Sequence, residues 1–317
     1  MRVLADSVSV VAPASSANLG PGFDVFGLAL GRPHDRVTLE RSPSGEFSLR
    51  LRVTPDVGIS SESKRNACGA VAMAIASDFR LKGDLRLKLR KGVPVGVGMG
   101  GSGASSAAAA VAMNELFGLG LKAKELIRYA GIGERASSGT AHLDNVTASI
   151  LGGFVVVPRN GSEPIRFQPP EAMRLCLATP RAHLPSRKTE YARSVLPRRV
   201  NLSQVVGNVF SSSRLVAGFA TKDIGLIGES MQDEIVEPAR AKMVPGYAAA
   251  RQGAIESGAS GVCISGAGPT VLAVVDRRRA SPNRVLEAML SSLRTARVSS
   301  TGFVTRPGRG AWVDGSG

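Results

Sequence analysis

Five glycines lie between residues 96 and 103, directly before a run of small residues that is typical of a helix. Glycine adopts backbone dihedrals closed to other residues, and without side chains in the way an anion can reach the main-chain amides. The following helix would add free N–H groups and the positive end of its dipole. Ser102, Ser105 and Ser106 supply hydroxyls that could cap this helix or ligate a hard cation such as Mg²⁺. The segment therefore predicts a phosphate site, with a nucleotide as the first candidate.

The small residues of this segment allow other interpretations. A run of glycine and alanine would also let a helix pack closely against a sheet. A dinucleotide-binding turn would need an acidic residue about twenty positions further on, at the end of a second strand. The nucleotide-binding pattern G-x-x-x-x-G-K-[ST] would need a lysine before Ser or Thr. Neither feature accompanies the glycines, so a phosphate site here must use another kind of loop.

The length of the chain predicts two domains. Its 317 residues exceed what one hydrophobic core usually holds. The stretch 159–170, rich in proline and glycine, is typical of a joint. We place an N-terminal domain at residues 1–160 and a C-terminal domain at residues 161–317.

Cysteine usage favours a reducing compartment, and the apolar stretches are too short for a membrane-spanning segment. Cys68, Cys176 and Cys263 are far apart without C-x-x-C spacing, which argues against a disulfide framework or a zinc cluster. The N-terminus lacks the apolar run of a signal peptide, and the longest apolar stretch, residues 107–113, is too short to span a bilayer. We expect a cytoplasmic protein with no membrane partner.

The charge of the chain favours anionic ligands. A net charge of +15 and a pI near 10.6 increase attraction for nucleotides, phosphorylated metabolites and nucleic acids alike. Arginines cluster at 198–199 and 277–279 without interleaved aromatic residues, so a stacking platform for single strands is poorly supported. We expect no nucleic acid partner, and a non-catalytic basic protein that binds nucleic acid stays open as the competing class.

Hydrophobic periodicity by itself predicts a mixed α/β chain. In the N-terminal half it predicts antiparallel strands, a turn-rich loop at 13–22, and helices at 66–79, after the glycines and at 122–129; the strands fall at 7–12, 25–30, 36–41, 47–53, 85–89 and 153–157. In the C-terminal half it predicts strands at 175–179, 261–264, 271–275 and 302–305, and helices at 203–219, 221–230, 245–256 and 282–295. Residues 306–317 read as a loose tail.

Three segments in order resemble the signature of the GHMP small-molecule kinases. They are residues 13–24, which read Pro-Ala-Ser-Ser-Ala-Asn-Leu-Gly-Pro-Gly-Phe-Asp, the glycine segment 94–104, and Ser-Gly-Ala-Gly-Pro-Thr at 265–270. Within that superfamily, residues 25–30 and His-Leu-Asp-Asn at 142–145 are similar to the homoserine kinase branch. The resemblance covers nearly the whole chain up to about residue 305.

The resemblance implies an α+β GHMP kinase fold. Its N-terminal domain would be ribosomal-protein-like with a left-handed βαβ crossover, its C-terminal domain would be ferredoxin-like, and the site would lie between them. The third segment, residues 265–270, would brace the phosphate loop. Family members are often dimers, which allows for a homodimer.

By resemblance, ATP binds the loop formed by Pro94, Val95, Gly96, Val97, Gly98, Met99, Gly100, Gly101, Ser102, Gly103 and Ala104. The Mg²⁺-binding serine of the family aligns with Ser102. The second Mg²⁺ ligand is expected in the loop after the next helix, where Glu134 is the only carboxylate. The chain departs from the family's G-L-G-S-S pattern, with Met99 for leucine and Gly101 for the first serine.

The substrate implied is L-homoserine, a zwitterion with a terminal hydroxyl. Its ammonium needs an anion, its carboxylate a guanidinium and its hydroxyl a polar partner. The implied residues are Asn18 and Asp24 for the ammonium, Arg193 and Arg240 for the carboxylate, His142 and Asn145 for the hydroxyl, and Thr189 beside them. Asp24, Asn18 and His142 could instead serve as turn or helix-end residues. Another GHMP kinase, acting on a neutral or phosphorylated alcohol, is the alternative enzyme.

Overall fold

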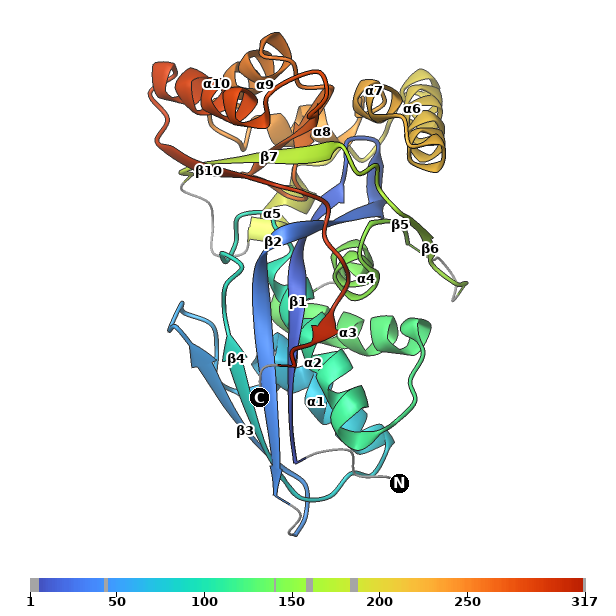
Figure 1. The fold of residues 1–317 in the computed structure, drawn as a ribbon, viewed down its shortest axis with the longest axis vertical. Coiled ribbons are helices and arrows are strands. Elements are labelled where there is room, and N and C mark those ends of the chain that lie inside the picture. Colours follow the sequence, from blue (N-terminus) through green and yellow to red (C-terminus); the bar gives the residue numbers. More distant parts are fainter. Residues whose placement is uncertain (1–5, 43–44, 140, 158–161, 183–187, 316–317) are drawn as a thin grey trace.

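The computed structural model describes residues 6–42, 45–139, 141–157, 162–182 and 188–315, which form two sheets and the helices around them (Figure 1). The first sheet has seven strands and contains the path β11-β1-β2-β4-β3, with β5 paired to β2 and β6 paired to β5. Its strands are β1 (Ser7–Asn18), β2 (Gly22–Ser42), β3 (Ser48–Thr54), β4 (Asp84–Arg90), β5 (Phe154–Val156), β6 (Ile165–Phe167) and β11 (Trp312–Val313).

Four helices pack with this sheet, because their small and apolar residues share one core with its strands, and a short 3-10 turn precedes the first of them. They are η1 (Ser63–Arg65), α1 (Ala67–Asp78), α2 (Gly101–Phe117), α3 (Ala123–Ser138) and α4 (Leu143–Leu151). The central helix is α2, where the alanines at 107–110 are fully buried. Alanine side chains let α2 approach β1 and β2 closely, which fixes the start of this helix at the end of the glycine segment.

The second sheet has four antiparallel strands in the order β10-β7-β9-β8. They are β7 (Met173–Pro180), β8 (Gly261–Ile264), β9 (Val271–Asp276) and β10 (Ser300–Thr305). Because helices separate β7 from β8 and β9 from β10, the arrangement is the β-α-β-β-α-β order of a ferredoxin-like domain.

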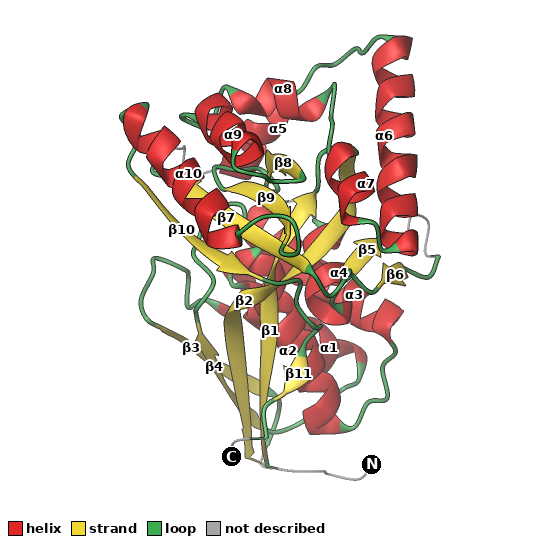
Figure 2. Ribbon diagram, turned by 45° about the horizontal axis from the view of Figure 1, so that its top comes forward, coloured by secondary structure: helices red, strands yellow, loops and turns green. Residues whose placement is uncertain are grey.

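The helices of the C-terminal half divide between the two sides of the second sheet (Figure 2). On one side lie α9 (Tyr247–Glu256) and α10 (Pro282–Thr295), whose apolar residues join one core with the strands. The other side packs against α6 (Leu202–Thr221) and α7 (Ile224–Glu229), in a core that also includes strands of the first sheet. In that shared core the rings of Phe154 and Phe219 stack at 3.9 Å between centroids.

Several predictions of strands and loops from the sequence are wrong. Segment 13–22 is not a loop, because β1 continues to Asn18 and β2 begins at Gly22. Strand β3 pairs with β4 in parallel, since α1 connects them. The last residues are not a loose tail: Val10 and Val11 of β1 pair with Val313 and Trp312 of β11.

Other elements were shorter in the prediction or missing from it. Helix α3 reaches Ser138, well beyond the predicted end at residue 129. Two short helices, α5 (Lys188–Ser194) and α8 (Val236–Ala241), had no sequence signal strong enough to predict them. The division at residue 160 stays a prediction, although β6 and β11 add to the first sheet. Among the described residues, no helix has the length and apolar content required to cross a bilayer.

Candidate active site

The carbonyl groups of the glycine segment before α2 accept hydrogen bonds from the protein around it. Gly98 O accepts from Ser265 Oγ at 2.7 Å, Val97 O from Thr270 N at 3.2 Å, and Met99 O from Ser15 N at 3.1 Å. The carbonyls of Gly96, Gly100 and Gly101 also accept hydrogen bonds, from Lys188 Nζ, Ala104 N and Lys91 Nζ. The predicted bracing by residues 265–270 is thereby present.

The backbone N–H groups of residues 96–103 differ from these carbonyls. Within the described chain none of them donates a hydrogen bond to protein, including those of the first turn of α2. A row of free amides at a helix N-terminus binds the oxygens of a polyphosphate. The phosphate site at the glycines stays a prediction, and these free amides support it.

Two of the glycines are required by close contacts. At Gly98, with φ of +87°, an added Cβ would lie 2.4 Å from Ser265 O. At Gly100, with φ of +62°, it would lie 2.3 Å from Ser15 Oγ and 2.5 Å from Asn145 Oδ1. Side chains are excluded at both positions by backbone conformation and by space.

A buried ion pair lies beneath the loop. Lys91 Nζ contacts Asp35, whose other carboxylate oxygen accepts from Gly92 N at 3.0 Å and Val93 N at 2.9 Å. Lys91 also holds Gly101 O at 2.8 Å. A Cβ on Gly101 would lie 3.2 Å from Lys91 Nζ, so a serine at this position would crowd the ammonium. The buried Lys91 therefore gives a physical reason for glycine, in place of the family's serine, at position 101.

The loop opens onto a cavity of about 720 Å³ that brings together most of the predicted site residues. Those that line it are Asn18, Asp24, Val95, Gly96, Gly98, Gly100, Gly101, Ser102, Glu134, His142, Asn145, Arg193 and Arg240. Met99 and Ala104 are buried in the core shared by both sheets, so their side chains cannot reach a ligand. Pro94, Val97 and Gly103 do not line the cavity either, and Thr189 lies on α5 with its side chain outside the described part.

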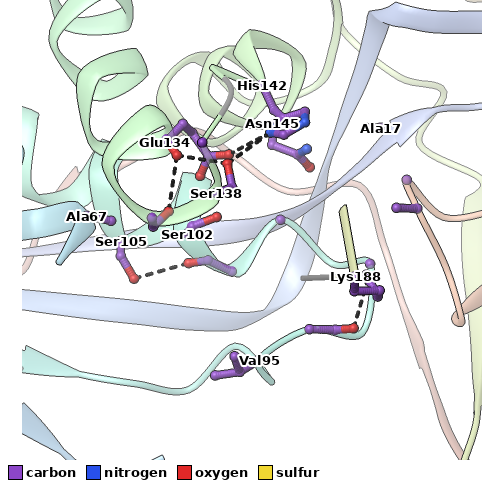
Figure 3. Close-up of a pocket in the computed structure, with 18 of the residues that line it drawn as sticks. Ala17, Ala67, Val95, Ser102, Ser105, Glu134, Ser138, His142, Asn145 and Lys188 are labelled. Carbon is purple, nitrogen blue, oxygen red and sulfur yellow. Dashed lines mark hydrogen bonds and ion pairs between the residues drawn. The ribbon is translucent and has the colours of Figure 1, made fainter. Parts of the chain in front are cut away.

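Ser102 and Glu134 line the cavity on the same side (Figure 3). Glu134 lies within α3 rather than in a loop after it, which corrects the prediction. Its Oε2 is 3.3 Å from His142 Nδ1, while Oε1 is buried and has no hydrogen-bond partner among the described residues. An orphaned carboxylate oxygen beside a serine at a helix N-terminus fits a hard cation that takes its other oxygens from phosphate and water.

The other end of the cavity pairs opposite charges. Arg193 Nη2 donates to both carboxylate oxygens of Asp24, at 3.0 and 2.9 Å, so the two residues predicted for opposite ends of the substrate contact each other. Arg193 Nε is buried without a partner among the described residues. The buried Arg240 donates to Gly266 O at 3.1 Å, and Asn18 Nδ2 donates to the same carbonyl at 3.0 Å.

Three polar residues at the start of α4, His142, Asp144 and Asn145, also line the cavity. Burial opposes the charge of His142, but the hydrogen bond and charge of Glu134 outweigh it and raise the pKa of His142. Burial raises the pKa of Asp144 to about 6. Asn145 is fixed by Ser15 Oγ, which donates to Oδ1 at 3.0 Å, and by Asp144 Oδ1, which accepts from Nδ2 at 3.2 Å.

Sequence analysis missed Asp144, Lys91 and Lys188, all of which line the cavity. Asp144 belongs to the quoted segment 142–145, so its place in a motif was a usable signal. Lys91 precedes the loop closely, but nothing in the sequence shows that Asp35 lies beside it. Lys188 is distant in sequence and reaches the loop only through the fold.

Sequence comparison agrees with this geometry. The profile of the GHMP kinases N terminal domain matches residues 66–153, and the profile of the GHMP kinases C terminal matches residues 215–294. A homoserine kinase of Thermoplasma volcanium is 42% identical over 272 residues, which cover 86% of this chain and 85% of that protein. The chain belongs to the GHMP kinase family.

Further relatives align with this GHMP kinase over nearly its whole length. A homoserine kinase of Halorubrum lacusprofundi is 40% identical over 306 residues, covering 96% of this chain and 99% of that protein. The crystal structure of homoserine kinase from Cytophaga hutchinsonii matches with a TM-score of 0.89 at 30% identity, covering 99% of each chain. The expected GHMP kinase fold is therefore confirmed.

The buried carboxyl of Asp144 makes the stability of this GHMP kinase depend on pH. Because folding raises its pKa from 3.8 to about 6, its ionisation destabilises the folded state as pH rises through this interval. Replacing Asp144 by Asn removes this cost and keeps an oxygen for the Asn145 amide. Above pH 7 the variant should therefore be more stable than the wild type by about 3 kcal/mol, since one pKa unit corresponds to about 1.4 kcal/mol.

Denaturant unfolding at several pH values measures this difference. The difference in unfolding free energy between Asp144→Asn and wild type should shrink as pH falls from 6 to 4. In that range Asp144 becomes protonated in the folded state and is then neutral, like the asparagine of the variant. The exposed Asp56 provides the control, and Asp56→Asn should show no such trend. A constant difference between Asp144→Asn and wild type across this range would contradict the assignment.

Proposed function

We propose that this GHMP kinase transfers the γ-phosphoryl group of ATP to the side-chain hydroxyl of L-homoserine, forming O-phospho-L-homoserine for threonine biosynthesis. The observation that carries the proposal is the shared cavity: free loop amides border one part of it, and the Asp24–Arg193 pair borders another. Homoserine kinase is also the name of the relatives and of the solved structure described above.

The phosphate end works by positioning and charge neutralisation. The transition state of phosphoryl transfer is loose, with negative charge spread over the equatorial oxygens. Amides that are already aimed at these oxygens stabilise them without reorganisation. Ser102 Oγ and the free Oε1 of Glu134 would hold Mg²⁺. The metal would neutralise charge on the β- and γ-phosphates.

The acceptor end suits a zwitterion. Asp24 accepts both contacts from a single nitrogen of Arg193, which leaves carboxylate lone pairs for an ammonium group. The unpartnered Nε of Arg193 and the guanidinium of Arg240 are available to a carboxylate. An ion pair therefore presents both poles to an amino acid, whereas a neutral alcohol would meet two charges that it cannot match.

Asn145 would hold the reacting hydroxyl. Ser15 and Asp144 fix both ends of its amide, and one Nδ2 proton remains to donate to a hydroxyl oxygen. A loose transition state places little demand on a base, so orientation of the oxygen is the main requirement. Residue His142 neighbours this position and keeps Glu134 in place through Oε2.

A coupled ADP-release assay tests the function directly. Wild-type protein with ATP and Mg²⁺ should release ADP with L-homoserine and much less with neutral or phosphorylated alcohols. Asp24→Asn should raise the KM for L-homoserine at least tenfold, because a charged hydrogen bond contributes about 1.5–3 kcal/mol. Exposed Asp56 again supplies the control, since Asp56→Asn should leave KM unchanged. Equal turnover with a neutral alcohol would refute the substrate assignment.

Location is inferred from the thiols. The cysteines Cys68, Cys176 and Cys263 are all unpaired and buried. We infer that the protein works in a reducing compartment, in keeping with a cytoplasmic biosynthetic enzyme.

A homodimer is also proposed, through α6. Leu202, Val206, Val209 and Phe210 follow one side of this helix and are 78, 60, 59 and 60% exposed. Arg214 is the single charged residue in its twenty. Two copies of a chain with net charge +15 repel each other, so an uncharged apolar face is where a second copy can bind.

Sedimentation at physiological salt tests this interface. Wild-type protein should sediment as a dimer, and Phe210→Glu should sediment as a monomer because the charge would be buried at the contact. The exposed Ala220 at the end of α6 gives the control, and Ala220→Glu should stay dimeric. A monomeric wild type at micromolar concentration would contradict the proposal.

A further inference from the structure

Two lysines hold carbonyl groups of the phosphate loop, and among the described residues only one of the two has an anionic partner. Lys91 pairs with Asp35 beneath the loop. Lys188, the first residue of α5, donates to Gly96 O at 2.8 Å and to Gly268 O. Lys188 lines the cavity, and among the residues that the structure describes no carboxylate forms an ion pair with it.

A partly buried ammonium without an anion is costly, because the carbonyl dipoles replace only part of its hydration. An ammonium has three N–H donors, and the two carbonyls account for two of them. The third is available to a ligand. In Figure 3 Lys188 lies at the other end of the glycine segment from Ser105.

The position of Lys188 lies between the two ends of the cavity. One of its carbonyl partners, Gly96, belongs to the phosphate loop, and the charge of Arg240 acts on it from the acceptor end. We propose that Lys188 is a further phosphate-binding residue, whose ammonium contacts the phosphoryl group that is transferred. This inference rests on the proposed use of ATP, but names a residue beyond the loop and the metal ligands.

The pKa of Lys188 supports this role. Burial first, and then the charge of Arg240, lower it to about 8. A bound phosphate would supply the missing negative charge and raise this pKa again, so ATP binding near pH 8 should be coupled to proton uptake by Lys188. As pH rises above 8, the free protein loses the ammonium and its affinity for ATP should fall.

Other charged groups also border the cavity around Lys188. Glu190 and Arg193 share its helix, Arg240 comes from α8, Asp24 from β2, and Lys91 lies under the loop. At the start of α4, His142 and Asp144 titrate as well. All of these groups are present in a Lys188 variant, so a comparison of variant with wild type isolates the contribution of Lys188.

Calorimetric titration with Mg·ATP, Mg·ADP and AMP in the absence of an amino acid is the test. At pH 7.5 the Lys188→Met variant should bind ATP about tenfold or more weakly than wild type, ADP less so, and AMP about equally. Lys188→Arg should retain most of the affinity. The exposed Lys124 of α3 gives a matched loss of charge, and Lys124→Met should bind all three nucleotides like wild type.

Two further readouts separate phosphate binding from a purely structural role. Between pH 7.5 and 9.5 the ATP affinity of wild type should fall more steeply than that of Lys188→Met, and wild type should take up more protons on binding ATP than the variant does. The unliganded variant should unfold no earlier than wild type, because an uncompensated cation has been removed.

Failure of this inference differs from failure of the proposed function. If wild type binds ATP and phosphorylates L-homoserine while Lys188→Met binds ATP equally well, Lys188 does not contact phosphate and the kinase assignment stands. Equal losses for ATP and AMP would also overturn the inference, because they would show a disturbed loop. No binding of ATP by wild type would overturn both.

Discussion

Everything in this site depends on which way one short backbone segment faces. The six carbonyls of residues 96–101 all accept hydrogen bonds from the protein, so the N–H groups of residues 96–103 are left for a ligand. Their donors come from β1, from the turn before β9, from α2, from the residue after β4 and from α5. A loop of glycines would otherwise be flexible, and folding fixes it from several sides before any ligand binds.

The charges around the loop follow from the same constraint. Amides without a hydrogen-bond partner attract anions, and the lysines that hold the loop add positive charge. Beneath the loop Asp35 neutralises Lys91, so that the ammonium can be buried without a ligand. At the far end, the Asp24–Arg193 pair is nearly neutral as a unit and still presents both charges to a zwitterion. Under the proposed function, these two regions of the cavity would bind the nucleotide and the zwitterionic substrate side by side.

Local sequence was sufficient to predict what depends on local chemistry. The glycines indicated a loop that leads into a helix, as observed. Helix α10 and strand β8 were predicted at their observed bounds, because capping residues and a short apolar run mark their ends. Motif resemblance placed Asn18, Asp24 and His142 in the cavity from segments far apart in the chain.

What sequence could not predict depends on long-range contacts. Proline and glycine in segment 13–22 suggested a loop, but pairing with β2 extends β1 through most of it. The last residues lacked a strong strand pattern, and long-range contacts order them: β11 pairs with the edge of β1, and Pro307 and Arg309 form bridges with Leu30 and Gly152. In the same way, the ion pair of Asp24 with Arg193 joins residues 169 positions apart, and no periodicity reports such a contact.

Amide hydrogen exchange at residues 96–103, measured with and without Mg·ATP, tests the central claim most directly. Without nucleotide these amides should exchange fast although the segment is well packed, because none donates a hydrogen bond to a described residue. With nucleotide they should become strongly protected, while the amides of α10 should not change. Strong protection before nucleotide is added, or no gain when it binds, would contradict the account.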